Sequence, residues 1–557
     1  MSQTAALGEA MRSYRGFQLP GIDMLCDWRE LTTAKQAQSA VHQLGREGML
    51  SELYGVTNWD FDFRGHKLAG DWQAALGVTI RVHHLTWMSM AGEAKRDYPA
   101  CIGYQSPWYR KYKLIEDYFS RLNTALVRGK PYVKIGVIHP IESYWLKWGS
   151  DETTGEERAE MDEGFAQLTR WLLYGLLDFD FISESLLEGL PDGGSGFKAG
   201  EMSYDAVVVP GCLTLRRNTK ERLERFAANG GTVIWLNRIP EYIDAKPAKD
   251  NGPGKIGTLI PYTKQAVLRA LEPLRTVDVR DRRGMRSDNL LSQQRQDGED
   301  RWLFLSHCEK PADPDNAAEE HWTISVAGTW SVEQYDAMDG SIRPIGAQCR
   351  SGKTAWETAS YAQDSFLYLL KPGCPETERV RPGSEIRRVS IAVPQTVRFA
   401  LEEPNALVLD MAEFKLDDGD WRGREEILRL DNILRRELGY PLRTDGYAQP
   451  WIYGERTYEH KVSLRYRVMS EIEIDQAELA LENEDITELR WNGEPIAHQV
   501  SGYYVDKQIK KIVLHGVKKG ENILEAAMPY HAGVDLESML ILGNFGVKAA
   551  GSTAVIT

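Results

Sequence analysis

GMLSELYG (48–55) is the stretch that decides how the N-terminal part of the chain folds. It is a short apolar strand that ends in a carboxylate and continues into the polar aromatic loop VTNWDFDFRGH (56–66). Two similar strands flank it, FQLPGIDML (17–25) and VTIRVHHL (78–85). Apolar residues at helical spacing lie between and after these strands, at 33–45 and 111–130. The alternation of strands with helices predicts a parallel sheet built from βα units.

A complete eight-stranded (β/α) barrel needs about 250 residues. Only residues 1–130 follow the βα pattern before it changes. We therefore predict that 1–130 is the C-terminal part of a TIM-type barrel.

Three further segments follow, which makes the chain a multidomain protein of mixed α/β and β structure. Residues 131–262 alternate Val/Ile-rich strands, such as VKIGVIH (133–139) and YDAVVVPG (204–211), with helices at about 156–177 and 218–229. This pattern predicts an amidotransferase-like or flavodoxin-like α/β domain with a parallel sheet. No GxGxxG or GxxxxGK[ST] motif follows its strands, so the sequence gives no support for a dinucleotide or P-loop site.

The second half of the chain is rich in alternating stretches. Residues 263–395, which include RWLFLSHCE (301–309), SFLYLLKPG (365–373) and IRRVSIAV (386–393), predict a β-rich domain. Residues 396–557 contain short strands with a WNG turn (491–493) and a GEN turn (520–522). They predict a galactose-binding-like jelly-roll β-sandwich.

Composition limits the class of protein. The chain has 557 residues, 42% of them hydrophobic, and a formal net charge of −14. Nucleic acid and membrane surfaces are therefore not expected partners. No apolar run of 18 residues and no secretion signal occurs, which predicts a cytoplasmic location for the chain as written.

The cysteine and histidine spacings do not suggest a metal site. The six cysteines form no CxxC pair, and no HxH or HExxH motif occurs. We predict neither a metal nor a cofactor. Cys212 follows a strand end, where an amidotransferase nucleophile would lie, but no Gly-rich elbow surrounds it.

Glu52 is the first candidate for catalysis. It lies at the C-terminal end of a predicted barrel strand, which is where the working residues of such barrels lie. Glycoside cleavage needs one carboxylic acid and a second carboxylate. Trp59, in the following loop, is placed to stack on a sugar ring. The alternative is that Glu52 makes a structural ion pair at the rim.

The second carboxylate has several candidates. Asp23 is preferred, because GIDM places it at the end of the neighbouring strand. The alternatives, each also interpretable as a turn or cap carboxylate, are Asp27, Asp60, Asp62, Glu93 and Asp97.

Side chains that bind substrate are expected after the third strand. His84 and Trp87 follow it, and strand alternation predicts that only one of His83 and His84 faces the barrel interior. Arg96 and Asp97 lie in the RDYP loop, where Arg96 either binds substrate or is solvated. In the predicted sandwich, Trp491, Tyr503 and Tyr504 form a carbohydrate-binding face or pack inside the domain.

The order of the segments, with PGIDMLCDW (20–28), TAKQAQSAVHQLGREGMLSELYGVTNWDF (33–61), GDWQAALGV (70–78) and RDYPACIGYQSPWY (96–109), resembles large bacterial glycoside hydrolases of family 106. That family is associated with α-L-rhamnosidase activity. The domain order is also similar to that of family 42 β-galactosidases.

The resemblance implies a glycoside hydrolase whose strand-end glutamate is Glu52 and whose sugar pocket is lined by the HHLTW and RDYP loops. It further implies a carbohydrate substrate and a homo-oligomer associated through the second α/β unit. Because family members carry further sequence before this point of the barrel, we expect a truncated or split form. The alternatives are a non-catalytic carbohydrate-binding or assembly protein, a β-galactosidase-like hydrolase and an amidotransferase-like enzyme acting through Cys212.

Overall fold

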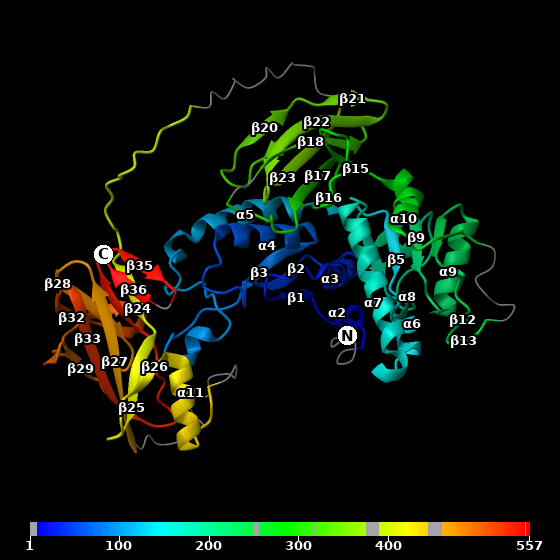
Figure 1. Cartoon of the computed structure of the whole chain (residues 1–557). Coiled ribbons are helices and arrows are strands. Elements are labelled where there is room, and N and C mark those ends of the chain that lie inside the picture. The colour runs from blue at the N-terminus through cyan, green and yellow to red at the C-terminus, as the bar shows by residue number, and fades with distance from the viewer. Residues whose placement is uncertain (1–7, 249–255, 316–317, 375–388, 444–458, 552) are drawn as a thin grey trace. The chain divides into compact units, whose positions relative to one another are not determined.

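A computed structural model describes residues 8–248, 256–315, 318–374, 389–443, 459–551 and 553–557. The chain divides into two compact units. The first contains residues 1–84 and 111–386, and the second contains residues 85–110 and 387–557. Figure 1 shows their elements in sequence colours. The boundaries expected at 130, 262 and 395 stay predictions.

Three parallel strands begin the first unit, in the order β1-β2-β3. They are β1 (Gly21–Met24), β2 (Met49–Leu53) and β3 (Val78–His83). Helices α3 (Leu31–Leu44), α4 (Phe63–Ala75) and α5 (Lys113–Leu126) alternate with them, and a short helix, α2 (Ala10–Tyr14), comes first. The predicted βα units are thus present, although the first strand is shorter than expected because it begins only after Pro20.

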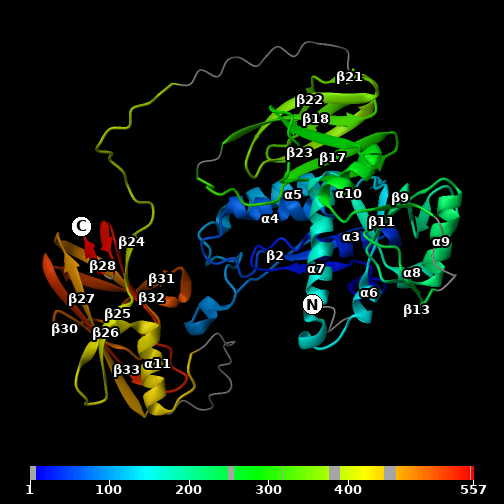
Figure 2. The same cartoon turned by 45° about the vertical axis from the view of Figure 1, so that its right-hand side comes forward.

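One face of this sheet is covered and the other is not. Ile22, Met24 and Leu53 are buried, whereas Asp23 and Val82 on the opposite face are exposed. Helix α4 lies between β3 and the strand β17 (Asp300–His307) of a separate β-sandwich, as Figures 1 and 2 show.

The second α/β segment has a five-stranded, all-parallel sheet in the order β14-β11-β9-β5-β6. Its strands are β5 (Ile135–Ile138), β6 (Phe179–Ile182), β9 (Ala206–Pro210), β11 (Thr232–Leu236) and β14 (Thr258–Ile260). The helices of the segment are α6 (Ile141–Leu146), α7 (Asp151–Tyr174), α8 (Glu184–Leu187), α9 (Arg217–Ala228) and α10 (Lys264–Leu271). The expected strands and helices therefore lie within a few residues of their predicted positions. Helix α3 joins this sheet to the first one, because Lys35 pairs with Asp178 and His42 with Asp180, at 2.9 and 2.8 Å.

The first unit ends in a two-sheet sandwich, which confirms that this segment is rich in β structure. One sheet has the order β15-β18-β22-β21 and the other β20-β19-β23-β17-β16-β4. The bounds are β4 (Lys130–Pro131), β15 (Val277–Asp281), β16 (Leu290–Asp297), β18 (Glu319–Ala327), β19 (Trp330–Tyr335), β20 (Ile342–Ile345), β21 (Gln348–Arg350), β22 (Lys353–Tyr361) and β23 (Ser365–Pro372). The strand expected at 386–393 is wrong for 389–393, which lie in no strand, and 386–388 lie outside the described residues.

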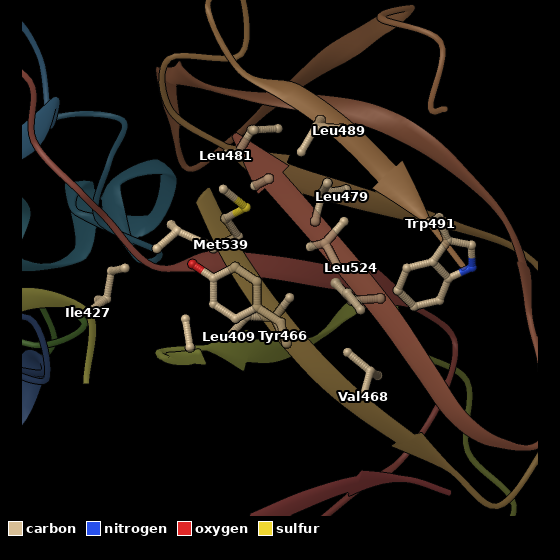
Figure 3. Packing of buried hydrophobic residues seen from close by; sticks show 14 of the residues in the cluster. Leu409, Ile427, Tyr466, Val468, Leu479, Leu481, Leu489, Trp491, Leu524 and Met539 are labelled. Atoms are coloured by element: carbon tan, nitrogen blue, oxygen red, sulfur yellow. The ribbon is translucent and has the colours of Figure 1, made fainter. Parts of the chain in front are cut away.

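The second unit is also a sandwich of two largely antiparallel sheets, and its jelly-roll topology stays a prediction. One sheet has the order β24-β34-β28-β32-β31, and the other contains β26-β25-β27-β33-β29-β30 with β35 and β36. The longest strands are β27 (His460–Ser470), β28 (Ile474–Leu481), β32 (Asp506–Val517) and β33 (Gly520–Tyr530). The remaining elements are β24 (Asn405–Leu409), β25 (Met411–Leu416), β26 (Arg422–Glu426), α11 (Ile427–Leu438), β29 (Glu488–Trp491), β30 (Glu494–Pro495), β31 (Val500–Tyr504), β34 (Met539–Gly543), β35 (Val547–Ala550) and β36 (Thr553–Ile556). Figure 3 shows the core between the sheets, where Leu479, Leu524 and Trp491 pack together.

Residues 85–110 are an unexpected part of the second unit. Lys95 pairs with Glu482 and Glu537 at 2.7 and 2.9 Å, and Gln105 donates to the buried Asp506 at 3.1 Å. The loop that follows β3 in sequence is therefore bound to a sandwich whose strands lie about 400 residues further along the chain. Of the helices in the described ranges, none is long and apolar enough to cross a membrane.

Candidate functional site

Asp23 and Glu52 lie side by side on the uncovered face of the first sheet. Asp23 of β1 is the register partner of Glu52 of β2, which is in turn the partner of Val82 of β3. Register partners on parallel strands project from the same face, and the strands lie about 4.8 Å apart. The two preferred carboxylates of the sequence are thus neighbours, one residue before the C-terminal ends of their strands.

The environment of Asp23 favours its protonated form. Although the residue is exposed, partial desolvation of its carboxyl group raises the pKa of Asp23. The negative charge of Glu52 raises this pKa further, while His84 opposes the shift. A carboxylic acid that keeps its proton to a higher pH beside a second carboxylate is the pairing that general acid catalysis uses.

The two adjacent histidines serve opposite faces, as strand alternation predicts. His84 lies near enough to Asp23 to act on its charge. His83 faces the helices, where its Nε2 lies 3.1 Å from a carboxylate oxygen of Glu116 on α5. Only His84 is therefore placed to act with the acidic pair.

The loops that follow β1 and β2 hold unusual backbone conformations. Tyr54, Val56 and Asn58 after β2 have φ of 75°, 57° and 77°, and Cys26 and Asp27 after β1 have φ of 56° and 52°. Positive φ is costly for such residues and for the β-branched Val56 above all. Strain of this kind gathers at functional sites, where the surrounding structure maintains it.

Arg81, Tyr54 and Glu116 form a polar cluster on the covered face of the sheet. This cluster was not predicted from the sequence. Arg81 of β3 donates to Tyr54 Oη at 3.3 Å and to Glu116 at 2.8 Å. Burial raises the pKa of Tyr54 to about 12, so its hydroxyl stays protonated. The alternation in VTIRVHH, which places Arg81 on the face of His83, is a sequence signal that could have revealed this cluster.

The other predicted substrate-binding residues lie in different surroundings. Trp59 is half-buried in the loop between β2 and α4. Trp87, Arg96 and Asp97 belong to the second unit, where Arg96 binds Glu537 at 2.5 Å and Glu93 at 2.9 Å. Asp23, Glu52 and His84 are thus grouped in the first unit, and the roles of Trp87, Arg96 and Asp97 stay predictions.

Several alternative carboxylates have structural partners. Asp27 pairs with Arg29 and Lys310, each at 2.6 Å. Asp62 caps the N-terminus of α4 by accepting from Gly65 N at 3.1 Å. These contacts match the interpretation of Asp27 and Asp62 as turn and cap residues.

Two further candidates are enclosed in protein cores. Cys212 is only 1% exposed, and burial raises the pKa of its thiol far above the usual range, which argues against a nucleophile. Trp491 is buried in the core of the second sandwich and donates to Gly516 O at 3.1 Å, whereas Tyr503 is 49% exposed. Within the described residues, no group of three or more His, Cys, Asp or Glu side chains is arranged to hold a metal ion.

Comparison of folds relates the chain to glycoside hydrolases. The rhamnosidase from Novosphingobium sp. PP1Y matches with a TM-score of 0.50 and 14% identity, over 94% of this chain and 48% of its own. A β-galactosidase from Bacillus circulans sp. alkalophilus matches with a TM-score of 0.45 and 13% identity, over 65% of this chain and 61% of its own. The α-L-fucosidase isoenzyme 2 from Paenibacillus thiaminolyticus gives 0.40 and 11%, over 66% and 67%.

The chain spans about half the length of the rhamnosidase that it matches. It has a glycoside hydrolase-like fold. Because the two sequences are only 14% identical, the comparison shows similarity of fold and not of activity. No protein-family model matches the sequence, and no curated protein sequence matches it significantly.

Proposed function

We propose that the protein is a glycoside hydrolase of the α-L-rhamnosidase type that acts through Asp23 and Glu52. The observation that carries the proposal is the direct register pairing of these two carboxylates at the ends of adjacent parallel strands. Two carboxyl groups at one site are what most glycoside hydrolases use to cleave the glycosidic bond. The fold shared with a rhamnosidase supports the same class of reaction.

The surroundings of the two carboxyl groups suggest a different role for each of them. Asp23, whose pKa is raised by partial desolvation and by Glu52, would protonate the departing glycosidic oxygen. Glu52 would attack the anomeric carbon or activate water, and His84 would hold a substrate hydroxyl beside the pair. Trp59, in the loop that follows β2, is a candidate for stacking on the sugar ring.

The test is hydrolysis of p-nitrophenyl α-L-rhamnoside and p-nitrophenyl β-D-galactoside by the purified chain. We expect the Glu52→Gln and Asp23→Asn variants to lose about 100-fold or more of the turnover, the usual size of an acid–base contribution. Asp288→Asn is the matched control, because Asp288 is an exposed carboxylate between β15 and β16, outside the sheet that carries the acidic pair. Unchanged turnover in a folded Glu52→Gln variant would remove Glu52 from the mechanism.

A second candidate function is carbohydrate binding without cleavage. The observation in its favour is the exposure of the face that carries the acidic pair, where Ile80 and Val82 are 36% and 42% exposed. Enzyme active sites are commonly enclosed clefts that exclude bulk water, whereas this face is open. Binding of an oligosaccharide by the chain, with no release of product by wild type, would favour this candidate.

A further inference from the structure

The second parallel sheet has a cavity at its topological switch point. The chain runs from β5 to β6 on one side and then to β9 on the other, so β5 and β9 are the strands between which the order reverses. A cavity of about 660 Å³ opens here, lined by His139 after β5, Gly211 after β9 and Asn237 after β11. Sheets of this type bind ligands in this crevice, and the volume suits a small molecule.

Two buried polar atoms in this cavity are left without hydrogen-bond partners among the described residues. They are Oε1 of Glu9 and Nδ1 of His139, in residues that are 3% and 6% exposed. The two atoms form an ion-pair contact at 3.8 Å, a distance too long for a hydrogen bond between them. Buried polar groups in native proteins normally have a partner, so these two atoms point to a bound group.

The hydrogen bonding of His139 defines what that group must be. Its Nε2 lies 3.1 Å from the amide nitrogen Nε2 of Gln36. An amide nitrogen only donates, so Nε2 of the ring accepts in this contact and a ring proton lies on Nδ1. The bridging group must accept from Nδ1–H of His139 and donate to Oε1 of Glu9. A hydroxyl group or a water molecule does both, whereas an ammonium group only donates.

The remaining lining agrees with a neutral, hydroxylated ligand. Phe165 and Tyr262 supply aromatic surface, and Phe165 lies 5.4 Å from the His139 ring. The charged side chains of the lining are Arg238 and five carboxylates, namely Glu9, Glu30, Glu157, Glu160 and Asp162. This excess of negative charge disfavours phosphates and other anions.

We propose that this cavity binds a small polyhydroxylated molecule of the monosaccharide class, at a site separate from Asp23 and Glu52. The ligand would place one hydroxyl between Glu9 and His139 and a ring face against Phe165. The inference does not depend on the proposed hydrolase activity, because none of its residues takes part in that reaction.

Saturation-transfer NMR with D-galactose and L-rhamnose tests the proposal on the full chain. We expect saturable binding of at least one sugar to the Glu52→Gln variant, in which cleavage is blocked. Thr33→Trp fills the cavity mouth from α3, and His139→Phe removes the donor, so each should weaken binding at least tenfold. Thr153→Trp adds the same ring at an exposed position outside the cavity lining and should bind like the parent.

The outcomes separate the two proposals. The cavity site would be overturned if the folded Thr33→Trp and His139→Phe proteins bound sugar as tightly as the Glu52→Gln parent. It would also be overturned if the parent bound propylamine and neither sugar. Absence of any sugar binding to the folded parent would also overturn it. If the Glu52→Gln protein no longer hydrolyses the substrate but still binds sugar, the result supports the proposed function and the cavity site separately.

Discussion

The ring of His84 packs directly over the α-carbon of Gly55. A Cβ at position 55 would lie 2.7 Å from Cγ and Nδ1 of His84 and 2.8 Å from a methyl group of Leu25. These separations are too short for any side chain, so only glycine lets the loop after β2 pass beneath the histidine.

Gly55→Ala is therefore expected to displace His84 from the acidic pair and to lower turnover by about 10- to 100-fold, the cost of a small misplacement. Initial rates on the p-nitrophenyl glycosides measure this effect. Gly16→Ala is the matched control, because its Cβ would meet no atom closer than 3.7 Å. Equal rates in wild type and Gly55→Ala would show that His84 has no positioning role.

Asp23→Asn should stabilise the protein at neutral pH. The pKa of Asp23 is higher in the folded state, mainly through desolvation and then through the charge of Glu52. Ionisation of Asp23 at higher pH therefore lowers the free energy of unfolding, and asparagine, which cannot ionise, avoids this loss. The gain in Tm over wild type should be present at pH 7 and vanish below the ordinary aspartate pKa of about 3.9. Thermal unfolding at both pH values, with Asp288→Asn as control, checks this; a gain that is independent of pH would contradict it.

His66 should make the first unit sensitive to acid. Burial lowers the pKa of this histidine from 6.5 to about 4, and its ring donates to Asp62 O at 2.7 Å. The stability that the neutral ring contributes is present above pH 6.5 and is lost as the pH falls toward 4, by about 3 kcal/mol. Urea unfolding from pH 7 to 4 should show a smaller loss for His66→Phe than for wild type. His321→Phe changes a half-buried histidine, and its pH profile should follow wild type.

Arg435 holds the second sandwich together from inside. It is fully buried on α11, pairs with Asp431 at 2.9 Å and donates to Val534 O at 2.7 Å. Removing one partner of a buried ion pair leaves an uncompensated charge, so Arg435→Met should destabilise this unit by about 3–5 kcal/mol. Arg436→Met, at the next and exposed position of the same helix, should stay within about 0.5 kcal/mol of wild type. Urea unfolding followed by tryptophan fluorescence compares them.

Patterns in short stretches of sequence predicted the features that depend on residues close together in the chain, such as the faces of a strand. Alternation in VTIRVHHL is enough to separate His83 from His84, and the order of strands is enough to bring Asp23 beside Glu52. The burial of a residue by segments far away in the sequence leaves no local pattern. Trp491 is a residue type that stacks on sugars, but it is buried in the core of the second sandwich. Glu9 and His139 gave no signal, because their approach depends on how the N-terminal helix meets the second parallel sheet.

The attachment of residues 85–110 to the second sandwich has a consequence for synthesis on the ribosome. These residues emerge long before the strands that bind Lys95 and Gln105. At about 5–20 residues per second, they wait for tens of seconds before Glu482 and Asp506 are made. The sandwich is then the last part to form, and it cannot be produced as a fragment that starts at its own first strand without losing the partners of Glu482, Asp506 and Glu537.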